Sequence, residues 1–309
     1  MINLQQIYNL LRPGIKAFIG QYDNIPEVWN KMYESDTSDK AFEYEDEIKG
    51  LGFAKEKLEG APIAQDSMSV MFQKVYRHKT YGLSFAMTDE AMKDNLYKKE
   101  FPKQLVSLKK SLSALKNQIA TNVLNLGATT EFSVDGIPLF SAVHPLANGD
   151  TNRNILGNAG AALSEIAIQE MYTQIMLFKE LSGLPVDISP RLLVVHPNQT
   201  VAAETIFGSQ FTTSINRPGG GAAALGANDI NIVSRNKIFP DGYESNKYIT
   251  STTGAYVITD ADRGLIHYKR EGISQKSWVD NTTDSIWFSA KERYCFGASN
   301  WRGVFRISA

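Results

Sequence analysis

Cysteine, long apolar runs and an excess of positive charge are all scarce in this chain of 309 residues. Its single cysteine, Cys295, has no partner for an internal disulfide, so we expect the protein to mature in a reducing compartment. No apolar run approaches the roughly 20 residues that a bilayer span needs, and the opening residues do not resemble a signal peptide. The sequence therefore predicts a soluble, cytoplasmic protein with no membrane partner.

An excess of charge of either sign is also missing, because 32 Lys and Arg balance 33 Asp and Glu for a formal net charge of -1. A general nucleic-acid binder would show a marked Lys and Arg excess, since its affinity comes from phosphate contacts. The composition thus excludes a basic DNA- or RNA-binding domain as the main function.

Motifs that carry chemistry are absent as well. No Gly-x-Ser-x-Gly elbow occurs, and the pair Asp260 and Asp262, standing before Arg263 and Gly264, favours a turn over a cation site. The histidines have no spacing suited to zinc: His78, His144, His196 and His267. We therefore expect no catalytic residue, no cofactor and no metal.

A glycine-rich segment at 217–228 has one feature of a phosphate loop. Gly221 and Gly226 show the right interval, but Ala227 and Asn228 occupy the positions where Lys and Ser or Thr bind phosphate and magnesium. A dinucleotide-binding turn is also excluded, since no strand pattern precedes the glycines. A surface loop is the favoured interpretation.

The chain does contain a long extended segment at 43–87. Residues 43–60 are charged and interrupted by glycines, and residues 68–87 alternate between two kinds of side chain, which predicts a strand. At about 3.3 Å per residue this strand would be roughly 60 Å long. Because a lone two-stranded ribbon is only marginally stable in water, we expect another copy of the chain as its neighbour.

A long helix is predicted to follow. Thr88 is a candidate N-cap, with Asp89 and Glu90 offsetting the helix dipole, Pro102 restarts or kinks the helix, and Gly127 ends it. The apolar stripe comprises Leu105, Leu108, Leu112, Leu115, Ile119, Val123 and Leu126. The lysines expected off this stripe are Lys103, Lys109, Lys110 and Lys116. The pattern indicates a spine about 36 Å long, against a sheet or a partner.

Residues 163–270 have the pattern of a compact α/β unit. A helix containing Ile168 and Leu181 is predicted to end at Gly183. The remaining predictions are strands at 192–195, 230–233 and 255–258, a short helix at 201–207, and strands at 285–288 and 303–307 that pair back with the spine region.

Three motifs in this order resemble a known family. They are YGLSFAMTDEA at 81–91, DGIPLFSAVHP at 135–145 and PRLLVV at 190–195. The chain is similar to the major capsid (head) proteins of tailed bacteriophages, closest to the Mu-like major head subunit group. The resemblance implies an α+β capsid fold. Its parts would be an N-terminal arm (1–42), an E-loop (43–87), a P-domain with the spine helix (88–162), an A-domain (163–270) and return strands to the P-domain (271–309).

The resemblance also implies a structural function. Pentamers and hexamers of the chain would build an icosahedral virion head around double-stranded DNA, assembled in the host cytoplasm, with a portal, a separate scaffold and decoration proteins as partners. Contact with the DNA would be non-specific, which suits a nearly neutral chain. An encapsulin-type compartment, which shares the fold but houses a protein cargo, is the alternative; an unrelated α/β enzyme lacks a recognisable site.

Under this interpretation, side chains of the extended arm and of the glycine-rich loop contact neighbouring subunits. The expected contact residues are Glu45, Glu47, Lys55, Lys57, Phe72, Arg77 and Arg217. Some relatives join a loop lysine to an asparagine of a neighbour, for which Lys49, Lys55 or Lys57 and Asn281 or Asn300 could be imagined. We favour solvated charges and turn formers at these positions, because no motif identifies a pair.

Overall fold

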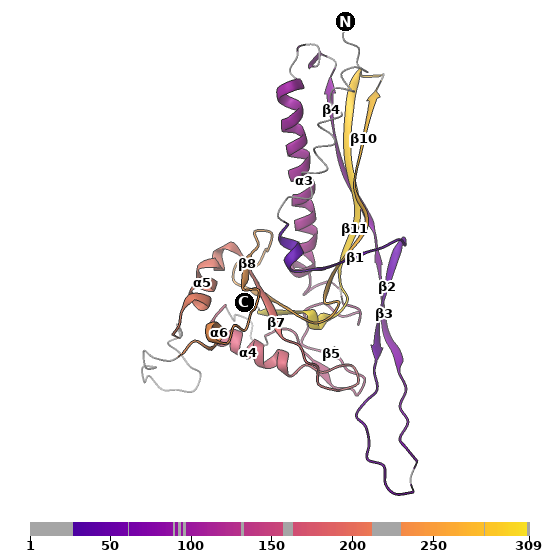
Figure 1. Cartoon of the computed structure of the whole chain (residues 1–309), viewed down its shortest axis with the longest axis vertical. Helices are drawn as coiled ribbons and strands as arrows, with labels where there is room; N and C mark the ends of the chain where they lie inside the picture. Colours follow the sequence, from indigo (N-terminus) through magenta and orange to yellow (C-terminus); the bar gives the residue numbers. More distant parts are fainter. Residues whose placement is uncertain are drawn as a thin grey trace.

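The computed structural model describes residues 27–60, 62–88, 90–91, 94, 97–130, 133–156, 163–211, 230–280 and 282–307. Three parts are visible in Figure 1: an upright sheet with a long helix beside it, a compact α/β unit at its foot, and a ribbon that extends away from both. The first 26 residues of the predicted N-terminal arm and the glycine-rich loop at 217–228 lie outside the described residues.

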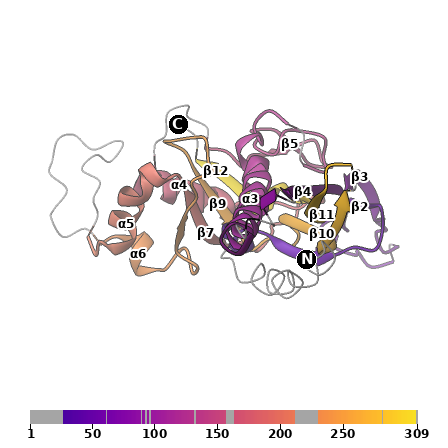
Figure 2. The ribbon, with the colours of Figure 1, turned by 90° about the horizontal axis from the view of Figure 1, so that it is seen from above.

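The upright part is a four-stranded sheet in the order β1-β10-β11-β4. Its strands are β1 (Glu34–Thr37), β10 (Leu265–Asp280), β11 (Ser285–Ala298) and β4 (Lys79–Thr88). The helix α3 (Tyr97–Asn125) packs beside β4 and β11 (Figures 1 and 2). Phe85 and Phe288 are cross-strand partners that stack at 5.4 Å, and Phe101 of the helix packs on Phe288 at 4.8 Å. Alternate strand residues therefore build a core under the helix.

The spine helix is confirmed, with corrections to its predicted faces. Leu108, Leu112 and Val123 are buried, but Leu115 is 36% exposed and Leu126, just after the helix, is 48% exposed. Lys116 was expected off the apolar stripe, and this is wrong, because its side chain is only 10% exposed. The short helix η1 (Val28–Lys31) packs against α3 and brings a carboxylate, Glu27, to Lys116.

The predicted ends of the spine helix differ from the structure. Thr88 does not begin this helix, because α3 starts at Tyr97; the amide of Ala91, which precedes α3, donates to Thr88 Oγ1 at 3.4 Å. Pro102 lies inside α3, so it does not end the helix. Gly127 follows the last turn for a packing reason: a Cβ there would lie 2.7 Å from the ring of Phe140.

The compact unit contains a second sheet in the order β12-β9-β7-β8. Its strands are β7 (Pro190–Val195), β8 (Tyr243–Ser245), β9 (Ala255–Thr259) and β12 (Val304–Ile307). The helices and turns around it are α4 (Glu165–Met176), η2 (Pro197–Gln199), α5 (Thr200–Gly208), α6 (Ile232–Arg235) and η3 (Trp301–Gly303). β7 and β9 are almost completely buried, which explains their uninterrupted apolar sequences.

Several boundaries in this unit differ from the predictions. The helix that was expected to reach Gly183 ends at Met176. The predicted helix was too long because Phe178 and Leu181, which are buried beyond its end, continue its apolar period. Residues 230–233 are not a strand: Asn231 caps α6 by accepting from the amides of Val233 and Ser234. The strand at 303–307 is confirmed as β12, but it pairs with β9 and not with the spine region.

The third part is the ribbon formed by β2 (Phe42–Lys49) and β3 (Ser69–Arg77), with a connecting loop at 50–68. The single strand predicted at 68–87 is in fact two strands separated by His78. β3 pairs with β2, and β4 pairs with β11. A two-residue pair, β5 (His144–Pro145) and β6 (Thr151–Asn152), completes the fold. Within the described ranges, none of the helices has the length and apolar character to cross a membrane.

Candidate functional site: the ribbon and its anchors

The β2–β3 ribbon has two faces of opposite character. Along β2, exposed and half-buried residues alternate, so that Phe42, Tyr44 and Ile48 face solvent. Glu45 and Glu47 lie between them, with side chains only 12% and 16% exposed. On β2, the glutamates therefore face the body of the molecule and the apolar side chains face outward, whereas Tyr76 and Phe72 of β3 lie on the inward side opposite Glu43 and Glu47.

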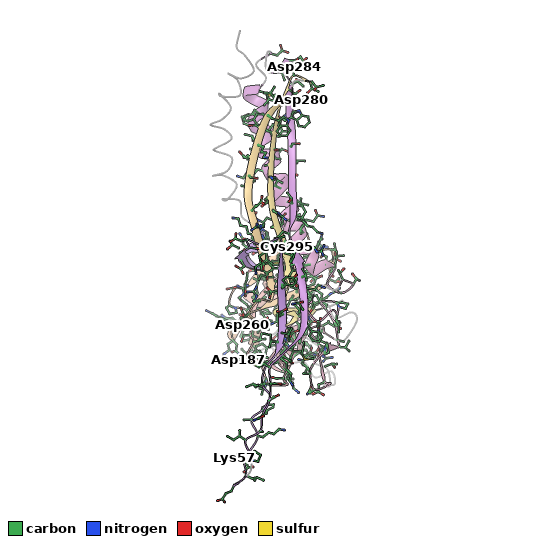
Figure 3. The ribbon with its side chains drawn as sticks, turned by 90° about the vertical axis from the view of Figure 1, so that its right-hand side faces the viewer. Lys57, Asp187, Asp260, Asp280, Asp284 and Cys295 are labelled. Carbon is green, nitrogen blue, oxygen red and sulfur yellow. The ribbon has the colours of Figure 1, made fainter. Side chains whose placement is uncertain are left out.

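Exposed apolar side chains gather in this segment. Those of the two strands are Phe42, Tyr44, Ile48, Val70, Met71 and Val75, and those of the loop are Leu51, Phe53, Leu58, Ile63 and Met68. Tyr44 pairs with Val75 across the ribbon, so its outward face is continuous over both strands. Figure 3 shows the loop with Lys57 at one end of the molecule, opposite Asp280 and Asp284. Exposed apolar side chains gathered in one segment mark a candidate site of contact with a partner.

The inward face is fixed by two ion pairs with the body. Arg263 Nε donates to Glu45 Oε2 at 3.1 Å, and Tyr268 donates to the same carboxylate. The hydrogen bond with Glu45 raises the pKa of Arg263, against the opposing effect of burial. Arg302 Nη1 donates to Glu47 Oε1 at 2.8 Å. These pairs hold the root of the ribbon on its own subunit.

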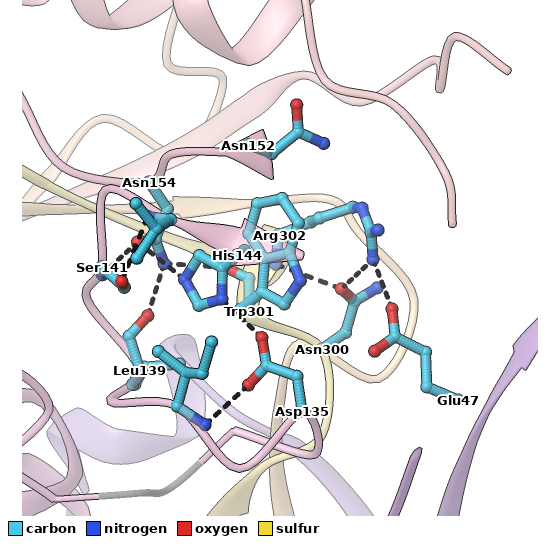
Figure 4. Close-up of polar contacts among 12 residues, drawn as sticks. Glu47, Asp135, Leu139, Ser141, His144, Asn152, Asn154, Asn300, Trp301 and Arg302 are labelled. Carbon is cyan, nitrogen blue, oxygen red and sulfur yellow. Dashed lines mark hydrogen bonds and ion pairs between the residues drawn. The ribbon is translucent and has the colours of Figure 1, made fainter. Parts of the chain in front are cut away.

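A stack of side chains lies behind the Arg302 anchor (Figure 4). The Arg302 guanidinium lies 4.3 Å from the ring centre of Trp301, and Trp301 stacks on His144 at 4.3 Å with an interplanar angle of 4°. His144 Nδ1 lies 2.6 Å from Asp135 Oδ2. Burial acts to raise the pKa of Asp135, but the contact with His144 and the hydrogen bond from the backbone amide of Ile137 act in the opposite direction, and the net pKa is lowered.

His78 is the junction between the ribbon and the upright sheet. The Nε2 atom of His78 lies 3.0 Å from Ser38 Oγ, and the Ser38 hydroxyl donates to Glu43 of β2. Burial lowers the pKa of His78; Glu43 opposes this change, and Arg293 and Arg270 add to it. These hydrogen bonds connect His78 to β2 at the point where the chain passes from β3 to β4.

A cavity of about 580 Å³ lies at the root of the ribbon, lined by β2 and by loops of the compact unit. Carboxylates predominate around it, including Asp187 and Asp260. Across the described part of the chain, no three His, Cys, Asp or Glu side chains are placed to hold a metal ion. Cys295 packs against buried aromatic rings, and burial raises the pKa of its thiol to about 12.

The structure places the predicted contact residues in different environments. Glu45 and Glu47 contact Arg263 and Arg302 of their own chain. Lys55 and Lys57 are exposed in the loop, Phe72 is half-buried opposite Glu47, and Arg77 is exposed. Arg217 lies outside the described residues. Asn300 Oδ1 accepts from the amide of Arg302, as a turn former does.

Sequence reasoning missed the outward residues of β2. Their signal is present, because Phe42, Tyr44 and Ile48 alternate with glutamates. The prediction named the charged residues Glu45 and Glu47 as contacts, because the sequence pattern alone does not show which face of the strand turns toward solvent.

Both the sequence and the fold of this chain are similar to those of known proteins. The family model described as "Phage capsid protein" matches residues 72–307. No curated protein matches the chain. The virus-like particle from Pyrococcus furiosus has 10% identity and a TM-score of 0.55, with 95% of this chain and 97% of that chain covered.

Two further solved structures share the fold. Mycobacterium phage Patience has 12% identity and a TM-score of 0.56, covering 99% of this chain and 88% of that chain. The holo-SrpI encapsulin complex from Synechococcus elongatus PCC 7942 has 9% identity and a TM-score of 0.53, covering 92% of this chain and 87% of that chain. At such identities the likeness supports the predicted α+β capsid fold. Because the family model spans most of the sequence, this chain belongs to the phage capsid protein family and is a structural protein of a bacteriophage capsid.

Proposed function

We propose that this capsid protein forms the pentamers and hexamers of an icosahedral head, and that the outward face of the β2–β3 ribbon is a principal subunit contact. The observation that carries the proposal is the orientation of the ribbon, with Glu45 and Glu47 facing its own body and Tyr44 and Val75 facing solvent. An apolar surface that is exposed in the described part of the chain is stabilised when a neighbouring copy covers it.

The physics of shell assembly fits this arrangement. Contacts of roughly 800 Å² per partner, repeated on several sides of a subunit, give a stable container. Heterologous contacts that close into rings place one subunit's ribbon on the next. In this proposal, 1–42 is the N-terminal arm, 43–87 the E-loop, 88–162 the P-domain, 163–270 the A-domain and 271–309 the return strands.

The finer assignments belong to the same proposal. The protein is Mu-like, acts without catalysis, and is assembled in the host cytoplasm with a portal, a separate scaffold and decoration proteins. It encloses double-stranded DNA by weak, non-specific contact, which agrees with the formal net charge of -1. Of the predicted contact residues, Lys55, Lys57, Phe72 and Arg77 contact a neighbour directly, and Arg217 does so near the capsomer axis. Glu45 and Glu47 act by holding the ribbon in place.

The test replaces the outward apolar pair by a charged pair, Tyr44→Lys with Val75→Glu. Because these residues are cross-strand partners, the opposite charges preserve the ribbon and remove its apolar face. We expect folded subunits that form no shells, measured by sedimentation and negative-stain microscopy. Asp46→Asn is the matched control, since Asp46 lies on the same face and an amide oxygen still accepts from Gln73. Normal shells from the double variant would overturn the proposal.

A second experiment removes the loop and leaves the anchors. The pairing of Lys49 with Ser69 allows residues 50–68 to be replaced by Asn-Gly, which favours a tight hairpin turn. We expect a stable subunit with defective assembly.

The contents of wild-type particles distinguish the two kinds of shell. Nuclease-protected DNA in these particles supports a phage head, whereas a protein cargo would favour an encapsulin-type shell.

A further inference from the structure

One side chain of the ribbon is buried in the body of the molecule. Across β2 and β3, whose residues are all described, Tyr76 is the only buried residue, with an exposure of 7%. Its hydroxyl donates to the carbonyl of Ala298 at 2.9 Å, and its ring centre lies 6.1 Å from that of Tyr268. Burial raises the pKa of Tyr76, so the phenol keeps its proton and remains a donor at neutral pH. Tyr76 therefore fastens the ribbon to the upright sheet.

The ring of Tyr76 packs directly on the backbone of a glycine in β11. A Cβ at Gly297 would lie 2.3 Å from this ring, and the three atoms nearest to that Cβ all belong to Tyr76. Gly297 does not have a positive φ, so its backbone conformation would accept an alanine. The contact with Tyr76 is therefore what excludes a side chain at this position.

This contact lies where the ribbon leaves the upright sheet (Figure 1). The pairing of β4 with β11 ends at Lys79 and Tyr294. Gly297 lies further along β11, where the strand still pairs with Ile266 of β10 but no longer with β4. The Tyr76 ring thus holds β3 against the part of β11 that β4 has left.

A small displacement at this contact becomes a large one at the far end of the ribbon. β3 has 9 residues, which span roughly 30 Å at about 3.3 Å per residue, and Tyr76 lies next to the end that joins His78. The anchors of Glu45 and Glu47 are long side chains, which can follow a rotation of the ribbon by changing rotamer. An aromatic ring that is packed on a backbone has no such freedom.

We propose that Tyr76 and Gly297 form a pivot that sets the direction of the ribbon, and that this direction sets the curvature of the assembled shell. The second step rests on the proposed function, in which the ribbon of one copy contacts the next copy. The angle between the ribbon and its own body then fixes the angle between neighbours, and this angle decides the size at which a container closes. Tyr76 and Gly297 are thus positioning residues, and neither has to touch the neighbouring copy.

The first test measures the direction of the ribbon in the unassembled full-length chain. Spin labels at Ser69→Cys, at the far end of β3, and Lys110→Cys, on α3, report their separation by pulsed electron paramagnetic resonance. Cys295 is retained, because burial raises its pKa to about 12 and leaves the thiol unreactive at pH 7. Gly297→Ala forces the ring to move by about 1 Å to reach ordinary contact, so we expect the separation to change by about 3 Å or more.

Two comparisons distinguish a pivot from a general loss of structure. Gly272→Ala, in β10, is the matched control and should leave the separation unchanged, since a Cβ there would meet only the side chain of Lys269, at 3.4 Å. In a Tyr76→Ala background the ring is missing, so adding Gly297→Ala should have no further effect. An unchanged separation in Gly297→Ala, or an equal shift with and without the Tyr76 ring, would refute the pivot.

Two variants test the same contact without adding an atom to β11. Tyr76→Phe keeps the ring on Gly297 and removes only the hydrogen bond to Ala298, so the mean separation should equal that of wild type. Tyr76→Ala removes the ring, and the distribution of separations should become at least about twofold broader, because partly exposed ion pairs hold a segment weakly. An equally narrow distribution in Tyr76→Ala would overturn the proposal even if Gly297→Ala does not fold.

The second test examines the assembled particles by negative-stain microscopy. We expect Gly297→Ala to form particles of changed diameter or open sheets, and Gly272→Ala to form particles of wild-type diameter. Wild-type particles from Gly297→Ala, or no assembly at all, would refute the link to curvature. Failure of the proposed function would be seen separately, because Tyr44→Lys with Val75→Glu leaves the pivot residues in place and the spin-label measurement needs no neighbouring copy.

Discussion

The β4–β11 pair and the β2–β3 ribbon are both antiparallel, and both alternate apolar with polar side chains. In β11, Ile286 and Phe288 are buried beneath the spine helix. In β2, Glu45 and Glu47 face the body, and Tyr44 faces solvent. The same two-residue period thus has opposite orientations. The sheet finds its apolar partner within its own chain, whereas the outward apolar side chains of the ribbon are exposed and, as we propose, are covered by a neighbouring copy.

The largest expected effect is a loss of subunit stability, and it should differ between the core of the sheet and the exposed loop of the ribbon. Phe288→Ala should destabilise the subunit by about 3–5 kcal/mol, because it leaves a cavity among Phe85, Phe101 and Met87. Urea unfolding of unassembled protein measures this change. Phe53→Ala, at a side chain that is 69% exposed, is the matched variant and should cost less than about 0.5 kcal/mol. Equal losses would show that the ribbon loop has a core of its own.

The next effect concerns the polar face of the ribbon. Glu47→Gln should cost about 1.5–3 kcal/mol, because the nearly buried Arg302 loses its charged acceptor. Denaturant unfolding again measures it. Glu56→Gln, in the exposed loop, is the control and should have no measurable effect. A neutral result at Glu47 would mean that the inward face does not anchor the ribbon.

A pH effect separates the upright sheet from the ribbon. The folded-state pKa of His267, about 3, lies below the ordinary value of about 6.5, so the unfolded chain binds the extra proton first. Stability should be unaffected above pH 6.5 and fall by up to about 1.4 kcal/mol per pH unit between pH 6.5 and pH 3. Urea unfolding across this range tests it. His267→Gln should reduce the slope, and an unchanged slope would assign the acid loss to other groups.

The smallest expected effect on the subunit is at the outward face. Tyr44→Ala should change the stability of the unassembled chain by no more than about 0.5 kcal/mol, since Tyr44 is 53% exposed. The same variant should raise the protein concentration at which shells form, as followed by light scattering. If it destabilised the subunit and left assembly unchanged, the comparison between the two regions would fail.

Periodicity was enough to predict the elements that bury a continuous apolar face. The spine helix, β7 and β9 follow from their own residues. β10 did not, because much of this 16-residue strand is polar and its conformation depends on pairing with β11. α6 was mistaken for a strand because four residues contain too little period, although Asn231 was its capping signal.

The extended segment was predicted in position, but the orientation of its faces was not predicted. The extended segment was expected to contact neighbours, and the glutamates were expected to make those contacts. Which face turns inward is decided by Arg263 and Arg302, which lie 218 and 255 residues along the chain from their partners Glu45 and Glu47. Hydrogen bonds over such separations leave no local pattern in the sequence.

The single residue between β3 and β4 has a mechanical consequence. Because only His78 separates the strands, there is no slack between the ribbon and the upright sheet. A pull on the ribbon becomes tension in β4, and it is resisted in shear by the pairing of Lys79–Thr88 with β11. Shear loads many hydrogen bonds at once, whereas peeling loads them one after another. The joint at His78 therefore transfers a load on the ribbon to the whole pairing of β4 with β11.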